Sequence, residues 1–228
     1  MSDGREDSVI EVFRQELREA CEDFELDDMN APVNGKDRYW NADEFFAIGE
    51  LFFMVEFKSY KHSLKSENRK DSACNLCFQL SGNTSAQALH DKAHFAAWGE
   101  KPRYKDLCCS IGIYRLLLCN EKALSSCVHV QSIPAVECGE LSTDFIQRVA
   151  ESEMGLTEGD FTSYLRWLID DENGGGGGSS GFPLGLYAFS NARRIKGHEF
   201  KDYEAFSAWA KHEPRVQNAR RLTRGYTP

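Results

Sequence analysis

DEFFAIGELFFMVEFK, residues 43–58, contains two runs rich in aromatic and aliphatic side chains, separated by Gly49-Glu50. Such runs are typical of β-strands, and a two-residue loop that begins with glycine suits a type II′ turn. We therefore predict a β-hairpin whose register places Asp43 opposite Glu56. The predicted pairs are Ile48–Leu51, Ala47–Phe52, Phe46–Phe53, Phe45–Met54, Glu44–Val55 and Asp43–Glu56.

Both faces of this hairpin are apolar, because successive side chains point to opposite faces of a strand. A sheet that is apolar on both faces needs helices packed against each of them. One face carries Phe46, Ile48, Leu51, Phe53, Val55 and Phe57, and the other carries Phe45, Ala47, Phe52 and Met54.

Helical and strand patterns alternate outside the hairpin. Residues 8–24 place apolar side chains on one stripe of an amphipathic helix, and residues 27–35 form a polar loop. Further helices are expected at 66–80, 86–98, 144–153 and 160–169, and further strands at 107–119, 127–133 and 184–190. The fold class is therefore α/β, with a mixed central sheet flanked by helices on both faces.

The chain is expected to form one domain over residues 1–228. Its 41% apolar and 28% charged residues are typical of a globular protein. The run GGGGGSSG at 174–181 cannot be ordered by side-chain packing, so we interpret it as a flexible loop. No membrane span or signal peptide is recognisable, and the eight cysteines lie mostly in apolar segments. We therefore expect reduced thiols and a cytoplasmic protein.

Charge is distributed unevenly along the chain, although the net charge of −9 disfavours nucleic acid. Residues 1–30 hold 11 acidic and 3 basic side chains, whereas residues 190–228 hold 9 basic and 4 acidic ones. One surface can therefore be basic, or the clusters are simply solvated. The candidate nucleic-acid contacts are Lys61, Lys65, Arg69, Lys70, Arg193 and Arg194.

The predicted register brings two acids together at the open end of the hairpin. Like charges at opposed positions destabilise a sheet, so we expect a positive charge to neutralise Asp43 and Glu56. Mg²⁺ favours one or two carboxylates together with waters and a substrate phosphate. Lys58 projects from the same strand face as Glu56, where it would lie near a metal-activated water or a phosphate oxygen.

Asp43, followed by Glu56-Phe57-Lys58 at the end of an apolar strand, resembles the PD-(D/E)XK, or restriction-endonuclease-like, nuclease superfamily. In that superfamily a helix comes first, the first acid begins the second core strand, and the (D/E)XK triplet lies on the third. Alanine precedes Asp43 where the superfamily has proline. The resemblance spans residues 8–135 and implies a restriction-endonuclease-like sheet.

The resemblance also implies roles for these residues. Asp43 and Glu56 would bind Mg²⁺ or Mn²⁺ together with the backbone carbonyl of Phe57, and Lys58 would orient or activate the attacking water. The metal would stabilise charge that develops on the scissile phosphate, so that a phosphodiester bond is hydrolysed.

Some members of the superfamily add a glutamate from the first helix. Glu16 is the acidic residue closest to the apolar stripe in the middle of the predicted helix, and Glu19 is the second choice. We therefore take Glu16 as the helix-borne candidate.

The resemblance implies a Mg²⁺- or Mn²⁺-dependent phosphodiesterase, an endonuclease rather than an exonuclease, that acts on DNA in preference to RNA in prokaryotic defence or repair. No Walker loop is present, so a protein partner would supply any ATPase or targeting activity. Homodimers are a tendency of the superfamily. The alternative is a non-catalytic nuclease-fold adaptor or interaction subunit, in which Lys58 and the two acids need not converge.

Two other spacings have simpler explanations. Cys74 and Cys77 have the spacing of a metal or redox pair, but they lie in a predicted helix and no second CxxC motif follows. His90 and His94 lack the glutamate of an H-E-x-x-H motif, so we expect a solvated helix face there.

Overall fold

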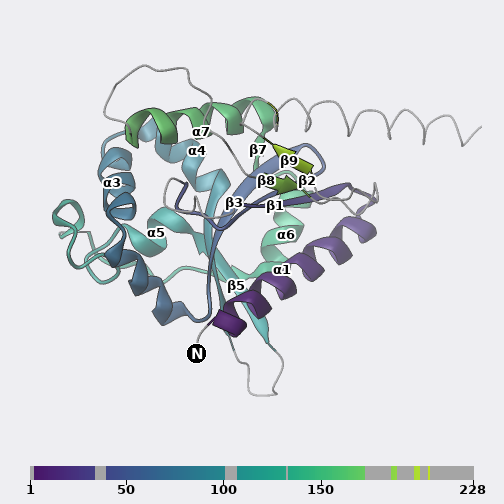
Figure 1. The fold of residues 1–228 in the computed structure, drawn as a ribbon, viewed down its shortest axis with the longest axis horizontal. Helices are drawn as coiled ribbons and strands as arrows, with labels where there is room; N and C mark the ends of the chain where they lie inside the picture. Colours follow the sequence, from purple (N-terminus) through teal and green to yellow (C-terminus); the bar gives the residue numbers. More distant parts are fainter. Residues whose placement is uncertain are drawn as a thin grey trace, which may run out of the picture.

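A seven-stranded sheet with helices on both faces forms the body of the protein (Figure 1). The computed structural model describes residues 3–33, 40–100, 107–131, 133–172, 186–188, 198–200 and 205. The strand order is β1-β2-β3-β4-β5-β6, with β7 paired to the start of β3. The pair β3 and β4 is parallel and the other pairs are antiparallel, so the α/β class with a mixed sheet is confirmed.

The strands of this sheet are β1 (Asp28–Pro32), β2 (Glu44–Ile48), β3 (Leu51–Lys58), β4 (His94–Glu100), β5 (Cys108–Ile113), β6 (Glu140–Leu141) and β7 (Leu156–Thr157). The helices are α1 (Asp3–Asp23), α3 (Asp71–Leu80), α4 (Thr84–Ala93), α5 (Tyr114–Leu118), α6 (Ser142–Ala150) and α7 (Glu158–Glu172), with 3₁₀ segments η1 (Lys61–Arg69) and η2 (Val128–Val130). A separate two-stranded sheet joins β8 (Leu186–Ala188) and β9 (His198–Phe200).

The predicted hairpin is confirmed as β2 and β3. Gly49 has φ +59°, the left-handed conformation that the two-residue loop requires and that glycine adopts without strain. Every predicted pair from the loop to Glu44–Val55 is present. The ladder ends there, because β2 begins at Glu44, so Asp43 and Glu56 are not a regular pair.

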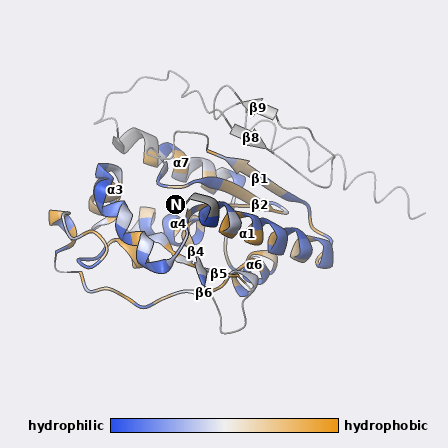
Figure 2. Ribbon diagram, turned by 60° about the horizontal axis from the view of Figure 1, so that its bottom comes forward, coloured by the Kyte–Doolittle hydropathy of each residue, from blue (hydrophilic) through white to orange (hydrophobic). Residues whose placement is uncertain are grey.

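Both faces of the sheet are buried, as predicted. Helices α1 and α6 cover one face, where Phe13 and Phe145 pack with Phe46 and Phe53. Helices α3, α4, α5 and α7 cover the other face (Figure 1). Hydrophilic and hydrophobic residues both occur along α1, as expected of a helix with one buried side (Figure 2).

Four segments differ from the prediction. Residues 94–98, predicted as helix, form β4, because pairing with β3 overrides the helical spacing of the preceding turns. The predicted strand at 107–119 ends at Ile113 and continues as α5, and in the predicted strand at 127–133 residues 128–130 form the 3₁₀ turn η2 instead. The predicted polar loop at 27–35 contains β1, which pairs with β2 at the edge of the sheet.

Four of the eight cysteines are paired, which corrects the expectation that all are reduced. Disulfides join Cys74 to Cys127 and Cys77 to Cys119, and they tie α3 to the segment after α5. The other four thiols are free. Reduced thiols at these four positions were one reason to expect a cytoplasmic protein, and the disulfides remove that reason.

A thiol titration tests this pairing. The unfolded protein should show four reactive thiols without reductant and eight after reduction, because two disulfides hold the other four sulfurs. Labelling in denaturant followed by mass spectrometry gives the count. Eight thiols in protein purified without reductant would contradict the pairing.

Within the described ranges, no helix is both long and apolar enough to cross a membrane. The predicted Gly/Ser loop at 174–181 lies outside these ranges, as do Arg193 and Arg194.

Candidate active site

Asp43 is held against β3 by two hydrogen bonds. Its backbone N–H donates to the carbonyl of Val55 at 2.9 Å, and its Oδ2 accepts a hydrogen bond from the N–H of Phe57 at 2.6 Å. The side chain therefore reaches across to the strand that carries Glu56. Burial and the negative charge of Glu56 raise the pKa of Asp43 to about 8.

Glu56 and Lys58 lie at the end of β3 and are both buried. They share one face of the strand, and the ammonium of Lys58 donates a hydrogen bond to Glu56 Oε1. The ammonium of Lys70 lies 2.8 Å from the same oxygen. Burial alone would raise the pKa of Glu56, but Lys58 and Lys70 together lower it to about 2.

Glu67 and Lys70 join this group from the end of η1. Glu67 is completely buried, and its Oε1 lies 3.2 Å from Lys58 Nζ and 3.1 Å from Lys70 Nζ. The hydroxyl of Tyr114 donates to Glu67 Oε2 at 3.4 Å. Lys70 was predicted to contact nucleic acid, whereas the structure places it among the carboxylates, and the sequence analysis did not select Glu67.

The structure brings Glu6, and not Glu16, towards this cluster. Glu6 accepts a hydrogen bond from the backbone of Ser59, and burial and the charge of Glu56 raise its pKa while Lys58 lowers it. Glu16 instead pairs with Ser142 Oγ, which also lies 2.8 Å from the carbonyl oxygen of Cys109. Glu6 was missed because the helix begins at Asp3, before the predicted start at 8.

The cluster contains carboxylate oxygens of the kind that hard divalent cations bind. Oε2 of Glu56 is buried and accepts no hydrogen bond among the described residues. Asp43, Glu56, Glu67, Lys58 and Lys70 carry three negative and two positive charges when all are ionised. Because the pKa of Asp43 is raised to about 8, negative charge is in excess only once Asp43 loses its proton. No described group of three or more His, Cys, Asp and Glu could hold a metal by itself, but Mg²⁺ needs only one or two carboxylates beside water and phosphate.

A buried histidine supports the segment that presents Asp43. His94 Nε2 bonds the carbonyl of Asn41 at 2.8 Å, and its Nδ1 lies 2.9 Å from the hydroxyl of Tyr164. His90 Nδ1 lies 2.6 Å from that hydroxyl. Both histidines are completely buried, so the expectation of a solvated helix face was wrong.

The stability of the protein should depend on His94 below pH 6.5. Burial lowers the pKa of His94 from 6.5 to about 4, so below pH 6.5 the unfolded chain binds a proton that the folded chain does not. By pH 4 this costs on the order of 3 kcal/mol of unfolding free energy. Urea unfolding from pH 7 to pH 4 should therefore show a smaller acid loss in His94→Gln than in wild type. The variant His129→Gln, at an exposed site, should lose as much stability in acid as wild type. An equal acid loss in His94→Gln and wild type would contradict the role of His94.

Three of the other residues predicted to contact nucleic acid are described by the structure, and two are not. Lys61, Lys65 and Arg69 are exposed on η1, beside the cluster. Arg193 and Arg194 lie outside the described residues, as already noted.

Comparison with known proteins gave no assignment. No family model matches the chain, and neither a curated protein nor a solved structure matches it.

Proposed function

We propose that the protein is a metal-dependent nuclease of the PD-(D/E)XK type that hydrolyses phosphodiester bonds in DNA. The observation that carries the proposal is the convergence of Asp43, Glu56 and Lys58 at one end of β3. The Phe57 N–H holds Asp43 beside Glu56, and Glu56 accepts a hydrogen bond from Lys58.

The order of the elements supports a restriction-endonuclease-like core. Helix α1 comes first, Asp43 directly precedes the second strand, and Glu56-Phe57-Lys58 ends the third. Helices α3 and α4 follow, and β4 then pairs with β3. The order of the first helix, the first acid and the (D/E)XK triplet agrees with what the resemblance implies.

The roles divide between the acids and the lysine. Asp43, Glu56 and the Phe57 carbonyl would hold the cation, which supplies Lewis-acid stabilisation of the phosphate and lowers the pKa of bound water. Lys58 donates hydrogen bonds, so it can orient the attacking water or bind a phosphate oxygen. Glu67 helps to hold the Lys58 ammonium, whose Nζ lies 3.2 Å from Glu67 Oε1. Lys70 in turn pairs with the two carboxylates that contact Lys58, Glu56 at 2.8 Å and Glu67 at 3.1 Å.

The convergence also favours an enzyme over an adaptor. Buried like charges cost free energy, and the raised pKa of Asp43 reflects that cost. An interaction subunit gains nothing from holding Asp43 and Glu56 together. A nuclease needs both acids to bind its cation.

Metal binding is tested by thermal unfolding with and without Mn²⁺. A ligand that binds only the folded state at 100 times its Kd stabilises that state by about 2.7 kcal/mol, so Mn²⁺ should raise the melting temperature of wild type. Glu56→Gln should lose most of the shift. Glu16→Gln is the matched control and should keep it, because Glu16 bonds Ser142 instead. A shift that survives in Glu56→Gln would count against the proposed ligands.

A further inference from the structure

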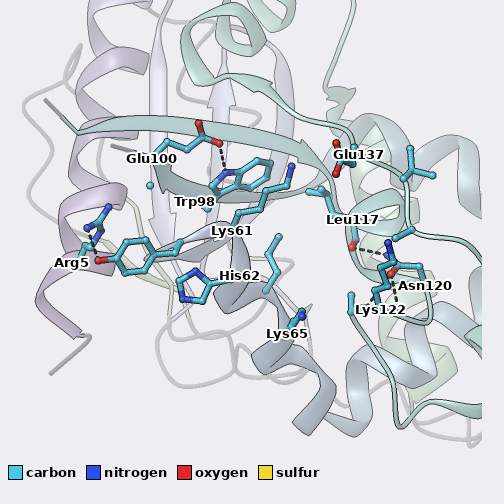
Figure 3. A pocket seen from close by; sticks show the side chains of 16 residues that line it. Arg5, Lys61, His62, Lys65, Trp98, Glu100, Leu117, Asn120, Lys122 and Glu137 are labelled. Atoms are coloured by element: carbon cyan, nitrogen blue, oxygen red, sulfur yellow. Dashed lines mark hydrogen bonds between the residues drawn. The ribbon is translucent and has the colours of Figure 1, made fainter. Parts of the chain in front are cut away.

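A pocket of about 760 Å³ is lined in part by Tyr60 and Lys61, which closely follow the end of β3. Figure 3 shows the side chains that line it. It is formed by the first turns of α1, by η1, by the end of β4, by the end of α5 with the loop that follows it, and by residues 135–137. Arg5 stands on one side and Lys122 on the other, with Lys61, His62 and Lys65 between them (Figure 3).

The walls of this pocket are apolar. Leu64, Leu117 and Ala123 line it as buried side chains, and the half-exposed Val136 adds to them. Trp98 completes this part, with its indole N–H donating to Glu100 at 2.8 Å. An apolar wall of this kind accommodates a flat ring or an alkyl group rather than a small ion.

The rim of the pocket is basic and aromatic. Its four permanent cations are Arg5, Lys61, Lys65 and Lys122, against the two acids Glu100 and Glu137. Tyr60 is 38% exposed, and its ring stacks with that of His62 at 5.1 Å between centroids. The guanidinium carbon of Arg5 lies 3.7 Å from the centroid of the Tyr60 ring. Cationic and aromatic side chains around an apolar hollow match a nucleobase that carries its phosphate.

The pocket and the candidate active site share one segment of chain. Tyr60 and Lys61 follow Lys58 by two and three residues, which limits the Cα separation of Lys58 and Lys61 to about 10 Å. Arg5 Nε donates to the carbonyl of Ser59 at 3.2 Å, on the pocket side. Glu6, the next residue of α1, bonds the backbone of Ser59 from the side of the acids.

We propose that this pocket binds an unpaired nucleobase next to the scissile phosphate, so that the substrate is single-stranded DNA or a junction with an unpaired nucleotide. The inference rests on the proposed nuclease function and names its substrate class. A base that is stacked and paired in an uninterrupted duplex cannot enter a pocket without being flipped out, which costs free energy. Single strands avoid that cost.

Binding without metal separates this inference from catalysis. The probe is a fluorescent 12-nucleotide single strand, about the site size of one binding module, compared by anisotropy in EDTA with the duplex of the same sequence. Wild type should bind the single strand more tightly than the duplex. Tyr60→Ala should weaken single-strand binding at least about fivefold, since stacking on an aromatic ring contributes roughly 1–3 kcal/mol per base. Tyr60→Phe, which keeps the ring, should restore most of the affinity.

Lys122→Ala tests the basic rim in the same assay. Loss of one phosphate contact should weaken binding and reduce the slope of log K against log salt by about one. Lys92→Ala is the matched control, because Lys92 is also exposed but lies on α4 and does not line the pocket. Equal affinity for single strand and duplex, unchanged in Tyr60→Ala and Lys122→Ala, would overturn the inference.

The same variants distinguish the two proposals. Metal-dependent cleavage at equal rates on single strand and duplex, in wild type and in Tyr60→Ala, would support the nuclease proposal and contradict the proposed role of the pocket. Pocket-dependent binding in EDTA, without cleavage in Mg²⁺ or Mn²⁺, would instead overturn the nuclease while the pocket keeps its ligand.

Discussion

Lys58→Met is expected to slow DNA cleavage by at least about 10²-fold, the usual effect of removing one hydrogen-bond donor that stabilises charge in a transition state. Methionine has nearly the length of lysine but carries no charge and donates no hydrogen bond. The acids Asp43 and Glu56 stay in place, so the variant should still show a Mn²⁺-induced thermal shift. Initial rates of plasmid cleavage and melting curves measure the two properties separately.

The stability of this variant has to be measured as well. Lys58 pairs with buried Glu56 and Glu67, and removing one partner of a buried ion pair costs about 3–5 kcal/mol. Lys58→Arg keeps the positive charge and should be more stable, yet it should still cleave slowly because its planar fork places its donors differently. Lys92→Met, at an exposed site, should match wild type. Cleavage at the wild-type rate by folded Lys58→Met would contradict the role of Lys58.

Phe13→Ala is expected to lower the free energy of unfolding by about 3–5 kcal/mol, as for other large-to-small core substitutions. Phe13 is completely buried between α1 and the sheet. Its ring lies 5.0 Å from that of Phe46 and 5.5 Å from that of Phe57, measured between centroids. Urea unfolding followed by circular dichroism gives the change.

Phe24→Ala provides the matched control for Phe13→Ala. Phe24 directly follows α1 and is 43% exposed, so its loss should cost much less. Phe13 also packs against Phe57, whose N–H holds Asp43, so Phe13→Ala should weaken Mn²⁺ binding too. Equal destabilisation by both substitutions would show that α1 is not anchored through Phe13.

Local pattern was enough to predict the central hairpin. The loop at Gly49 fixes the register of the two strands. Because side chains alternate along a strand, the register also fixes which of them lie on each apolar face of the sheet. Segments whose structure depends on distant partners were not predictable in this way. Strand β4 exists through its parallel pairing with β3, and β1 through its pairing with β2, although Pro32 and Asn30 are poor strand residues.

The site was predictable only where it lies on that hairpin. Asp43, Glu56 and Lys58 follow from the register, whereas Glu67 and Lys70 reach the cluster because η1 turns back over the end of β3. Sequence spacing gives no sign of that turn. Glu6 could have been found from the sequence. It lies three residues before Val9 and seven before Phe13, and this spacing places it on the same buried stripe of the helix.

The disulfides were missed for a similar reason. Connectivity among several cysteines cannot be deduced from their spacing. Cys119 and Cys127 come within bonding distance of α3 only because α5 ends the predicted strand early and turns the chain.

Cleavage of nucleic acid by purified protein tests the central claim most directly. Supercoiled plasmid, single-stranded DNA and RNA would be incubated with wild type and Glu56→Gln in Mg²⁺, Mn²⁺ or EDTA. The account predicts metal-dependent cutting of DNA by wild type that disappears in EDTA and in Glu56→Gln. Folded wild-type protein that shows a Mn²⁺-induced thermal shift but leaves every substrate intact would contradict it.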